Sequence, residues 1–358
     1  PCEAAETDED DMCFWQYSSG TTGAPKAVVH RQRGAAAPAT LHGRHVVGIG
    51  RDDRVYSVPK LFFSYGLNNS LTIPLSAGAA AILDPRRPEP AATCTLVREE
   101  RPTVLYAVPT FYASLLRAVE AGDADLDVSS IRVCVSAGEA LPAPILERWR
   151  RRFGLELLDG IGSTEIGYIC LSNTAGAVRP GTSGRVIPGY EARIVDEDGV
   201  AVPSGGVGEL WVRGPSTALG YWRDDERTGR TFRGGWVATG DRYVQDADGY
   251  FVFQGRADDL LKVSGQWVSP LEVEAVLLTH PAVAECAVAG RSDRDGVTKP
   301  CAYVVAREGV IAGDGLAAEL QALVRRTLAP FKFPRWVEFV DGLPKTSTGK
   351  IQRFRLRS

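Results

Sequence analysis

The sequence predicts an α/β protein with a parallel, helix-covered sheet, an antiparallel β subdomain and a small α+β domain towards its C-terminal end. Three observations support this fold class. Short apolar strands alternate with helical segments from residue 12 to about 170, a pattern typical of parallel sheets. Strands separated by turn residues follow from 176 to 255. A charged joint at 255–259 then precedes a segment of mixed helices and strands.

The elements of the α/β part follow from apolar runs bounded by turn residues. The predicted strands are Arg54–Val58, Ala79–Leu83, Val104–Ala107, Ile131–Ser136 and Leu155–Ile161. The predicted helices between them are Ala91–Glu100, Thr110–Ala121 and Pro144–Phe153. In addition, Met12–Tyr17 is predicted to be a buried strand, and Ala27–His30 is predicted to open a helix.

The later segments show hairpin and capping signals. Strands are predicted at Glu191–Val195, Gly208–Arg213, Tyr243–Gln245 and Tyr250–Phe253, the last two around the turn Asp246–Gly249. After a hairpin of Leu260–Val263 and Trp267–Val268, the N-cap Ser269, Pro270 and Glu272 predict a helix start. The remaining predicted elements are Val283–Ala289, Ala302–Val305, Gly315–Leu328 (a helix) and Trp336–Val340.

These patterns predict the domain organisation. We expect a large domain at 1–255, with its α/β part at 1–175 and its β subdomain at 176–255. A hinge is expected at 256–259, and a C-terminal domain at 260–358.

Composition limits the classes of function. A net charge of −3 gives no electrostatic reason to expect nucleic acid or an anionic membrane as partner. The seven cysteines are scattered without a C-x-x-C pair, so they predict neither a zinc site nor a redox motif. We find no signal peptide or membrane-spanning apolar run, and therefore expect a cytoplasmic protein. The sequence does not predict the oligomeric state.

A segment of small polar residues follows the first predicted strand, and it reads Ser18-Ser19-Gly20-Thr21-Thr22-Gly23-Ala24-Pro25-Lys26. Glycines let backbone N–H groups converge on one point and hydroxyls add further donors, which suits a polyphosphate. In the Walker pattern the lysine directly follows the second glycine, unlike here. For this loop alone, a flexible turn of small residues is the better interpretation.

Four further motifs change that interpretation, and they are Gly162-Ser163-Thr164-Glu165, Thr239-Gly240-Asp241, Gly255-Arg256 with Asp258-Asp259, and Lys345–Lys350. In this order the five motifs resemble the adenylate-forming family of acyl-CoA synthetases, adenylation domains and luciferases. The resemblance runs from Phe14 to Arg353. It implies that a carboxylate is joined to the α-phosphate of ATP with release of pyrophosphate, and that the acyl group then passes to a thiol. It also implies Mg²⁺ as cofactor and coenzyme A as co-substrate.

The resemblance assigns roles at the phosphates. The loop of Ser18, Ser19, Gly20, Thr21, Thr22, Gly23 and Lys26 would hold the β- and γ-phosphates. Thr164 would contact the α-phosphate, and Glu165 would be a hard oxygen ligand of Mg²⁺. Taken alone, Glu165 is better interpreted as a solvated turn carboxylate.

The resemblance also assigns roles at the nucleoside. Asp241 would accept hydrogen bonds from both ribose hydroxyls, with Arg256 supporting the ribose and phosphate side. Gly138 and Glu139 end an apolar strand where a flat purine would lie against the backbone. Asp159 would meet the adenine amino group. Each of these residues alone fits ordinary turn chemistry.

Catalysis in the family involves movement of the small domain. Lys350 would touch both the attacking carboxylate and the α-phosphate, with Asp258 as the swivel residue. After rotation, Ser264 and Gly265 would line the channel for the pantetheine arm of coenzyme A. The C-terminal domain is therefore predicted to be mobile.

The resemblance places an acyl pocket at two segments. Its expected residues are Phe62, Ser64, Tyr65, Ile161, Gly162, Tyr168 and Ile169. This lining is aromatic and uncharged, and no aspartate for a substrate ammonium occurs between Val55 and Pro74. Within the family the sequence is most similar to those of benzoate and 4-hydroxybenzoate CoA ligases. The ring substituents stay open, as does the choice between free coenzyme A and a carrier protein.

Two further interpretations concern the histidines and the start of the chain. His42 and His45 are spaced like half of a metal site, but a solvated helix face is the favoured interpretation. Family members carry a further segment before the phosphate loop. The sequence is therefore expected to be part of a longer enzyme, to be completed by another chain, or to be an inactive nucleotide- or acyl-binding remnant.

Overall fold

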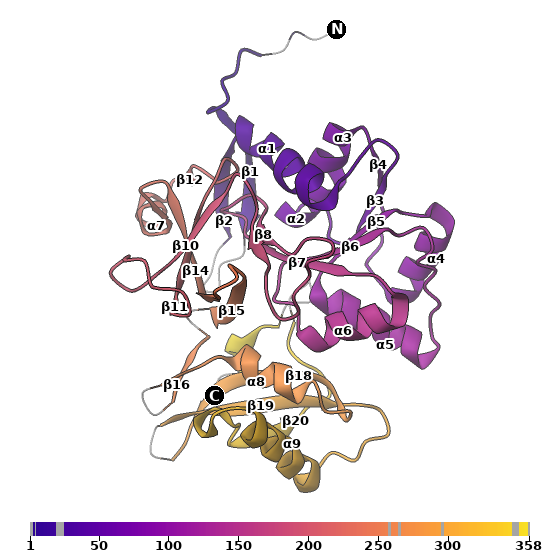
Figure 1. Cartoon of the computed structure of the whole chain (residues 1–358), viewed down its shortest axis with the longest axis vertical. Helices are drawn as coiled ribbons and strands as arrows, with labels where there is room; N and C mark the ends of the chain where they lie inside the picture. Colours follow the sequence, from indigo (N-terminus) through magenta and orange to yellow (C-terminus); the bar gives the residue numbers. More distant parts are fainter. Residues whose placement is uncertain are drawn as a thin grey trace. The chain divides into compact units, whose positions relative to one another are not determined.

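The computed structural model describes the chain except for residues 1, 2, 4, 19–24, 257–258, 264–265, 295–296, 346–350 and 357–358, and for the side chains of 262, 267 and 354. The described residues form two compact units (Figure 1). The first comprises 1–141, 145–239 and 244–252, and the second comprises 142–144, 240–243 and 253–358. The mixed helix and sheet architecture confirms the predicted fold class. The predicted boundaries and the hinge at 256–259 stay predictions.

A seven-stranded sheet in the order β4-β3-β5-β6-β7-β8-β9 forms the centre of the first unit. Its first five strands pair in parallel, and β8 and β9 add antiparallel. The strands are β3 Arg54–Ser57, β4 Ala80–Ile82, β5 Val104–Ala107, β6 Val133–Ser136, β7 Leu157–Gly162, β8 Ile169–Ser172 and β9 Arg185–Val186. The five predicted strands agree with β3 to β7 to within two residues at each end.

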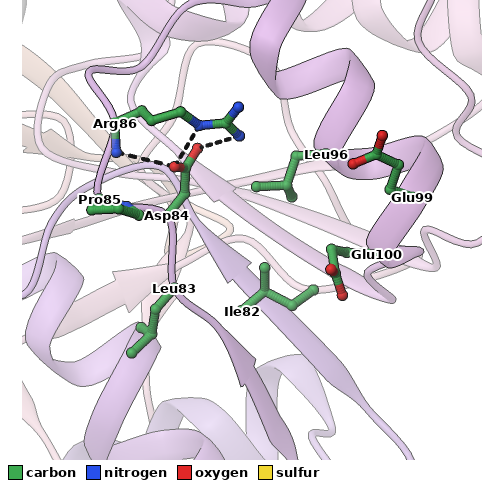
Figure 2. Close-up of a pocket in the computed structure, with 8 residues that line it drawn as sticks. All are labelled: Ile82, Leu83, Asp84, Pro85, Arg86, Leu96, Glu99 and Glu100. Atoms are coloured by element: carbon green, nitrogen blue, oxygen red, sulfur yellow. Dashed lines mark hydrogen bonds and ion pairs between the residues drawn. The ribbon is translucent and has the colours of Figure 1, made fainter.

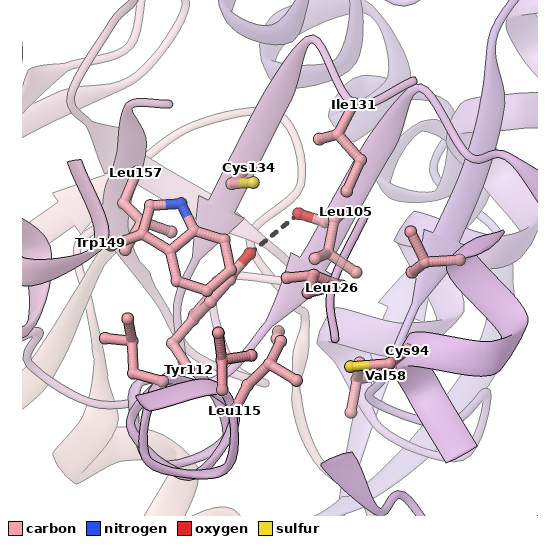
Figure 3. Packing of buried hydrophobic residues seen from close by; sticks show 14 of the residues in the cluster. Val58, Cys94, Leu105, Tyr112, Leu115, Leu126, Ile131, Cys134, Trp149 and Leu157 are labelled. Atoms are coloured by element: carbon pink, nitrogen blue, oxygen red, sulfur yellow. Dashed lines mark hydrogen bonds between the residues drawn. The ribbon is translucent and has the colours of Figure 1, made fainter. Parts of the chain in front are cut away.

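Three predicted helices cover one face of this sheet, and they are α4 Pro90–Glu100, α5 Pro109–Ala121 and α6 Ala143–Phe153. Proline at the first position suits the start of α5, because its ring fixes φ and a first-turn N–H would have no helical partner. Tyr112, Leu115, Leu116 and Val119 of α5 recur at helical spacing and are buried against the sheet. Figure 3 shows this core, in which the Tyr112 hydroxyl donates to the carbonyl of Leu105.

The other side of the sheet carries short helices that the sequence did not predict (Figure 1). They are α1 Gln32–Pro38, the π-helix η1 Ala39–Val47, α2 Ser64–Leu67, the π-helix η2 Asn68–Thr72 and α3 Ile73–Ala77. α1 runs directly into η1, and α2 into η2 and α3, and the π-helical turns interrupt the 3.6-residue period by which an apolar helix face is recognised.

A second sheet joins β1 Met12–Ser18, β2 Lys26–Arg31 and β12 Gly220–Tyr221 in that order. Two predictions are wrong here. Ala27–His30 lies in the central strand β2 and opens no helix, because its β-branched valines and neighbouring residues are buried between two strands. β1 is not a buried strand, since Trp15 is 50% and Tyr17 is 68% exposed at the edge of the sheet.

The β subdomain contains β10 Glu191–Val195, β11 Val207–Arg213, β13 Phe232–Arg233, β14 Trp236–Gln245 and β15 Phe251–Arg256, with α7 Asp225–Thr231 before β13. The four predicted strand segments fall within or overlap β10, β11, β14 and β15. The predicted turn between the last two is present, and the N–H of Tyr250 donates to Asp246 Oδ1 at 2.9 Å.

The second unit contains its own core. A hairpin of β16 Leu261–Val263 and β17 Gln266–Val268 precedes the helix α8 Pro270–Leu277. A three-stranded sheet follows, formed by β18 Val283–Ser292, β19 Thr298–Ala306 and β20 Trp336–Phe339. The remaining helices of the unit are α9 Asp314–Thr327 and the 3-10 helices η3 Pro330–Lys332 and η4 Arg353–Leu356. Ser269 caps α8 as predicted by accepting the N–H of Glu272. Successive side chains of β18 point to opposite faces of the sheet and pack in different hydrophobic clusters. Cys286 and Val288 pack with residues of α8 and α9, whereas Ala287 and Ala289 belong to a second cluster.

Candidate active site

Glu165 lies in a tight turn between β7 and β8. The N–H of Gly167 donates to the carbonyls of Ser163 and Thr164, at 3.0 and 3.2 Å. Gly167 has φ of 90°, and an added Cβ would lie 2.6 Å from the carbonyl oxygen of Ser216, so a side chain at this position would be strained. The turn therefore fixes the backbone on both sides of Glu165 at the end of a sheet strand.

The side chains of Lys26 and Tyr221 both contact Glu165. Lys26 Nζ lies 2.7 Å from Glu165 Oε1, and it also donates to the Tyr221 hydroxyl at 2.9 Å. The Tyr221 hydroxyl in turn donates to Glu165 Oε1 at 2.9 Å. Lys26 begins β2, Tyr221 belongs to β12, and both strands lie in one sheet. The first and second predicted motifs are thus in direct contact, through a tyrosine that belongs to neither.

The charges of this cluster support one another. Burial alone would raise the pKa of Glu165, but Lys26 and the hydroxyl of Tyr221 hold it below its usual value. Burial would lower the pKa of Lys26, and the ion pair with Glu165 raises it above its usual value. Both groups are therefore charged at neutral pH. A single ionised oxygen ligand of this kind fits Mg²⁺, which usually binds one or two carboxylates together with phosphates and water.

Only part of the predicted phosphate loop is described. Ser18 ends β1 and pairs in register with Lys26 at the start of β2, so the two ends of the loop lie side by side. Ser19, Gly20, Thr21, Thr22 and Gly23 lie outside the described residues. The contact of this loop with phosphates stays a prediction.

The predicted adenine side is built on neighbouring strands. Ser136 ends β6 and pairs in register with Asp159 of β7, and Gly138 and Glu139 follow in the loop after β6. Asp159 is only 3% exposed. Burial raises its pKa well above the usual value, which favours the neutral carboxylic acid. A neutral acid both donates and accepts hydrogen bonds, as the edge of a purine requires.

Asp241 and Arg256, the predicted ribose residues, lie together in the second unit. Arg256 Nη1 donates to Asp241 Oδ1 at 3.0 Å. Gly240 precedes the aspartate, and an added Cβ there would lie 3.2 Å from Arg256 Nη2. The structure thus brings these two predicted residues into one ion pair, and their contact with ribose stays a prediction.

The two segments predicted for the acyl pocket contact each other. Ser64 Oγ donates to the carbonyl oxygen of Gly167 at 2.6 Å, and Asn68 Nδ2 donates to the same oxygen at 3.1 Å. An added Cβ at Gly162 would lie 2.0 Å from the carbonyl oxygen of Tyr168, so the backbones of β7 and β8 meet without room for a side chain. Ile161 pairs with Leu171, and Ile169 pairs with Gly162, across the same two strands.

Aromatic rings surround Tyr168. The ring centroid of Tyr65 lies 6.1 Å from that of Tyr168 and 5.9 Å from that of Tyr106. The Tyr168 hydroxyl hydrogen bonds to Oδ1 of the buried Asn69. Burial raises the pKa of Tyr168 well above its usual value, so this hydroxyl stays neutral. Phe62 is 70% exposed and packs on Phe63 with ring centroids 4.4 Å apart, so its place in a pocket stays a prediction.

The interpretation of His42 as part of a solvated face is wrong. His42 is fully buried in η1, and its ring meets Tyr168 edge-on with centroids 5.2 Å apart. Both of its ring nitrogens have no hydrogen-bond partner among the described residues. Burial lowers its pKa to about 3, so the ring is neutral at physiological pH. His45, three residues later, is exposed as expected.

Several predicted residues lie outside the described residues, and they are Lys350, Asp258, Ser264 and Gly265. Three described residues near the site were not predicted: Tyr221, Asn69 and Tyr106. The pair Asn68-Asn69 in an uncharged, largely apolar segment was a usable signal, because buried amides need specific partners. No feature of the sequence singles out Tyr221 or Tyr106 from other tyrosines.

A pocket of about 320 Å³ lies between the end of β4 and α4 (Figure 2). Its walls include Ile82, Leu83 and Leu96, and Arg86 pairs with Asp84 at its edge. None of its lining residues is a predicted site residue. It therefore adds nothing to the candidate site.

The described part of the chain contains neither a membrane-spanning helix nor a cluster of metal-ligating side chains. No helix there is long and apolar enough to cross a bilayer. No group of three or more histidine, cysteine, aspartate and glutamate side chains there is arranged to hold a metal ion. The predicted cytoplasmic location stays a prediction.

Sequence comparison assigns the chain to a family. The AMP-binding enzyme family matches residues 1–222, and the AMP-binding enzyme C-terminal domain matches residues 272–350. The chain is a member of the AMP-binding enzymes, which confirms the predicted family.

Its relatives include aromatic-acid ligases. The chain is 51% identical to the benzoate–CoA ligase of Thauera aromatica over 358 residues, which is 99% of this chain and 67% of that protein. It is 45% identical to the 4-hydroxybenzoate–CoA/benzoate–CoA ligase of Rhodopseudomonas palustris, covering 99% of this chain and 65% of that protein. The chain thus spans about two thirds of the length of these relatives. Their names agree with the predicted reaction, the formation of an aryl-CoA.

Solved structures of aromatic-acid CoA ligases have the same fold as this chain. The fold matches that of the anthranilate CoA ligase AuaEII in complex with anthranoyl-AMP, with a TM-score of 0.94, 43% identity, and coverage of 99% of this chain and 69% of that one. It also matches a benzoate CoA ligase from Burkholderia xenovorans LB400, with a TM-score of 0.91, 48% identity, and coverage of 99% and 70%.

Proposed function

We propose that this chain is the catalytic part of an AMP-forming aryl-CoA ligase that activates a benzoate-like acid. The carboxylate oxygen of the acid bonds to the α-phosphorus of ATP, and the bond to the bridging oxygen breaks with release of pyrophosphate. The thiol sulfur of coenzyme A then attacks the acyl carbon, and AMP leaves. ATP, Mg²⁺ and coenzyme A are the partners of this reaction.

The chain supplies groups that bind and orient the charged reactants. Lys26 is the cation for the β- and γ-phosphates, and Thr164 is the donor for the α-phosphate. Glu165 holds Mg²⁺, which when bound offsets the charge of the phosphates. Asp241 with Arg256 holds the ribose, and Asp159 reads the adenine edge. Lys350 contacts the reacting carboxylate and the α-phosphate, and its positive charge offsets their negative charges.

The single observation that carries the choice of acid is the uncharged cluster of aromatic residues around Tyr168. Tyr65, Tyr106 and Tyr168 present aromatic rings, and the groups that bond there are neutral hydroxyls and amides. Such neutral aromatic surroundings suit a flat apolar ring, whereas a buried ammonium without a carboxylate partner costs several kcal/mol. The relatives named as benzoate and hydroxybenzoate ligases support the same class.

The test is acid-dependent exchange of pyrophosphate into ATP, measured with benzoate, hydroxybenzoates, aminobenzoates, cyclohexanecarboxylate and phenylalanine. We expect benzoates to exchange on the order of a hundredfold or more faster than phenylalanine. Equal rates with benzoate and phenylalanine would contradict the aromatic-acid assignment. No exchange with any acid would favour an inactive nucleotide-binding remnant.

A carrier protein is the second candidate for the acyl acceptor. The p-hydroxybenzoic acid–AMP ligase FadD22 of Mycobacterium tuberculosis is 38% identical over 97% of this chain and 49% of that protein, and its name gives the adenylate without coenzyme A, so the names of the relatives leave the acceptor open. Pre-made benzoyl-adenylate offered together with coenzyme A or with a phosphopantetheinylated carrier separates the two. Thioester formed only on the carrier would replace coenzyme A as the acceptor.

A further inference from the structure

Tyr221 holds the centre of the charged cluster. Its hydroxyl accepts a hydrogen bond from Lys26 Nζ and donates one to Glu165 Oε1, each at 2.9 Å. A tyrosine hydroxyl is the type of group that can do both at once, because it has one proton and free lone pairs. The ring also lies under the ammonium, with Lys26 Nζ 4.5 Å from its centroid.

The surrounding structure fixes this tyrosine. Its backbone pairs with Val28 of β2, and its N–H donates to Thr228 Oγ1 at 2.9 Å. Its ring meets Phe232 with centroids 5.6 Å apart, and the residue is only 6% exposed. The hydroxyl is therefore pre-placed before any ligand arrives, as a positioning group requires.

The cluster conflicts with the roles that the proposed function gives to its members. Lys26 is assigned to phosphates and Glu165 to Mg²⁺, yet in this structure each is the partner of the other at 2.7 Å. When Lys26 turns to a phosphate, the buried Glu165 carboxylate loses its cation and needs another. Its side chain is 14% exposed, so an unpaired charge there is costly until that cation arrives.

We propose that Tyr221 is a positioning residue for Glu165, whose carboxylate it holds through the exchange in which Lys26 leaves for a phosphate oxygen. The inference rests on the proposed function for the roles of Lys26 and Glu165. The hydroxyl of Tyr221 keeps Glu165 Oε1 in place when Lys26 departs, because its own backbone and ring contacts do not depend on Lys26. The carboxylate then meets the incoming cation already oriented.

The first test uses binding without any carboxylic acid. Affinity for α,β-methylene ATP is measured by titration calorimetry at a series of Mg²⁺ concentrations, with the wild type and with Tyr221→Phe. Phenylalanine keeps the ring under Lys26 and removes only the hydroxyl. The Mg²⁺ concentration for half-maximal affinity should rise by roughly tenfold or more, the scale of a hydrogen bond to a charged group.

Tyr250→Phe is the matched control. It also removes one hydroxyl hydrogen bond, from Tyr250 to the carbonyl of Ala177 at 3.0 Å, in the same unit. Its Mg²⁺ dependence should equal that of the wild type. An unchanged Mg²⁺ dependence in Tyr221→Phe overturns the proposal and leaves Tyr221 a structural residue.

The second test does not depend on the folding of Tyr221→Phe. Mn²⁺ alone is titrated without nucleotide and followed by electron paramagnetic resonance. Lys26→Met removes the cation that occupies Glu165, so Mn²⁺ should bind this variant more tightly than the wild type. Equal or weaker binding overturns the exchange of Lys26 at Glu165. Because neither test contains an acid, both can succeed even where the proposed acid specificity fails.

Discussion

Arg353 donates to both carboxylate oxygens of Glu274, at 2.9 Å to Oε1 and 2.7 Å to Oε2. This pair joins η4 to α8, and the N–H of Val288 donates to the same Oε1 at 2.7 Å. The two side chains are 15% and 7% exposed. Helix η4 is therefore tied to the core of the second unit by a buried ion pair whose carboxylate also accepts a backbone hydrogen bond from β18.

The first prediction is that Glu274→Ala strongly destabilises the second unit. The change leaves the Arg353 charge and the Val288 N–H without their acceptor, and breaking a buried pair in this way costs about 3–5 kcal/mol. Hydrogen exchange of the β18 and β19 amides measures the loss within this unit.

Glu285→Gln is the control, because it breaks the more exposed pair with Lys345, whose side chains are 32% and 23% exposed. That loss should be about 1 kcal/mol or less. Equal losses in the two variants would contradict the importance of burial for the Glu274 pair.

The second prediction concerns Asp53. Burial alone would raise its pKa, but Arg132, Thr103 and the N–H of Gly50 lower it from 3.8 to about 2. A carboxylate whose pKa is depressed by folding stabilises the protein above its unfolded pKa, and that contribution is lost as pH falls from 3.8 towards 2. Asp53→Asn should therefore cost up to about 2 kcal/mol at pH 7, and the difference from wild type should shrink below pH 4.

Urea unfolding at pH 3, 4, 5 and 7 measures this difference. Glu191→Gln is the control, since its pair with Arg213 is exposed, with side chains 59% and 46% accessible. It should leave stability nearly unchanged, because an exposed ion pair contributes little. A loss for Asp53→Asn that stays constant from pH 7 to pH 3 would refute the linkage.

The third prediction concerns His42, whose pKa burial lowers from 6.5 to about 3. Between these values the unfolded chain binds a proton that the folded chain excludes. Neutral His42 therefore costs no stability above pH 6.5. Below that pH the free energy of unfolding decreases by about 1.4 kcal/mol per pH unit because of this residue. His42→Phe, which keeps an aromatic ring beside Tyr168, should show a shallower decline between pH 7.5 and pH 5.

His45→Gln is the matched control on the same helix, because His45 is exposed. Its stability should follow the wild-type pH dependence. Parallel declines for His42→Phe and the wild type would show that the unfolded and folded states bind the same number of protons at His42.

The sequence predicted the parts of the fold in which period and length are strong. α5 spans thirteen residues with a proline start, and strands such as β5 are apolar throughout, so their assignment needed no tertiary information. The helix predicted at Ala27–His30 was wrong because a short apolar run fits either a helix or a strand, and only the pairing with β1 and β12 decides between them. The helices between 32 and 77 contain π-helical turns, which interrupt the 3.6-residue period of an apolar face.

The candidate site divides in the same way. Glu165, Lys26, Asp241 and Arg256 were found because their motifs have recognisable spacing, and the structure pairs them two by two. Tyr221 was missed because its role comes from the pairing of β12 with β2, which brings it near residues that are 56 and 195 positions away. His42 was misjudged because its burial depends on packing against Tyr168, a distant residue in sequence.

The last prediction separates the two half-reactions of the proposed function. Lys350 and Gly265 lie outside the described residues, and their roles rest on the motifs in which they occur. If the C-terminal domain swivels at Asp258, each of them serves only one step. Lys350→Ala should slow adenylation by roughly a hundred- to a thousandfold, the scale for one pre-placed electrostatic group. It should leave thioester formation from pre-made acyl-adenylate nearly unchanged.

Gly265→Ile is the reciprocal variant, because a branched side chain would obstruct the thiol channel while pyrophosphate exchange persists. Asp258→Pro stiffens the joint and should impair the step whose conformation it disfavours. Both partial reactions are measured on each variant. Equal slowing of both steps by Lys350→Ala would mean that one arrangement of the domains serves both reactions, since a lysine withdrawn by rotation cannot affect the second step.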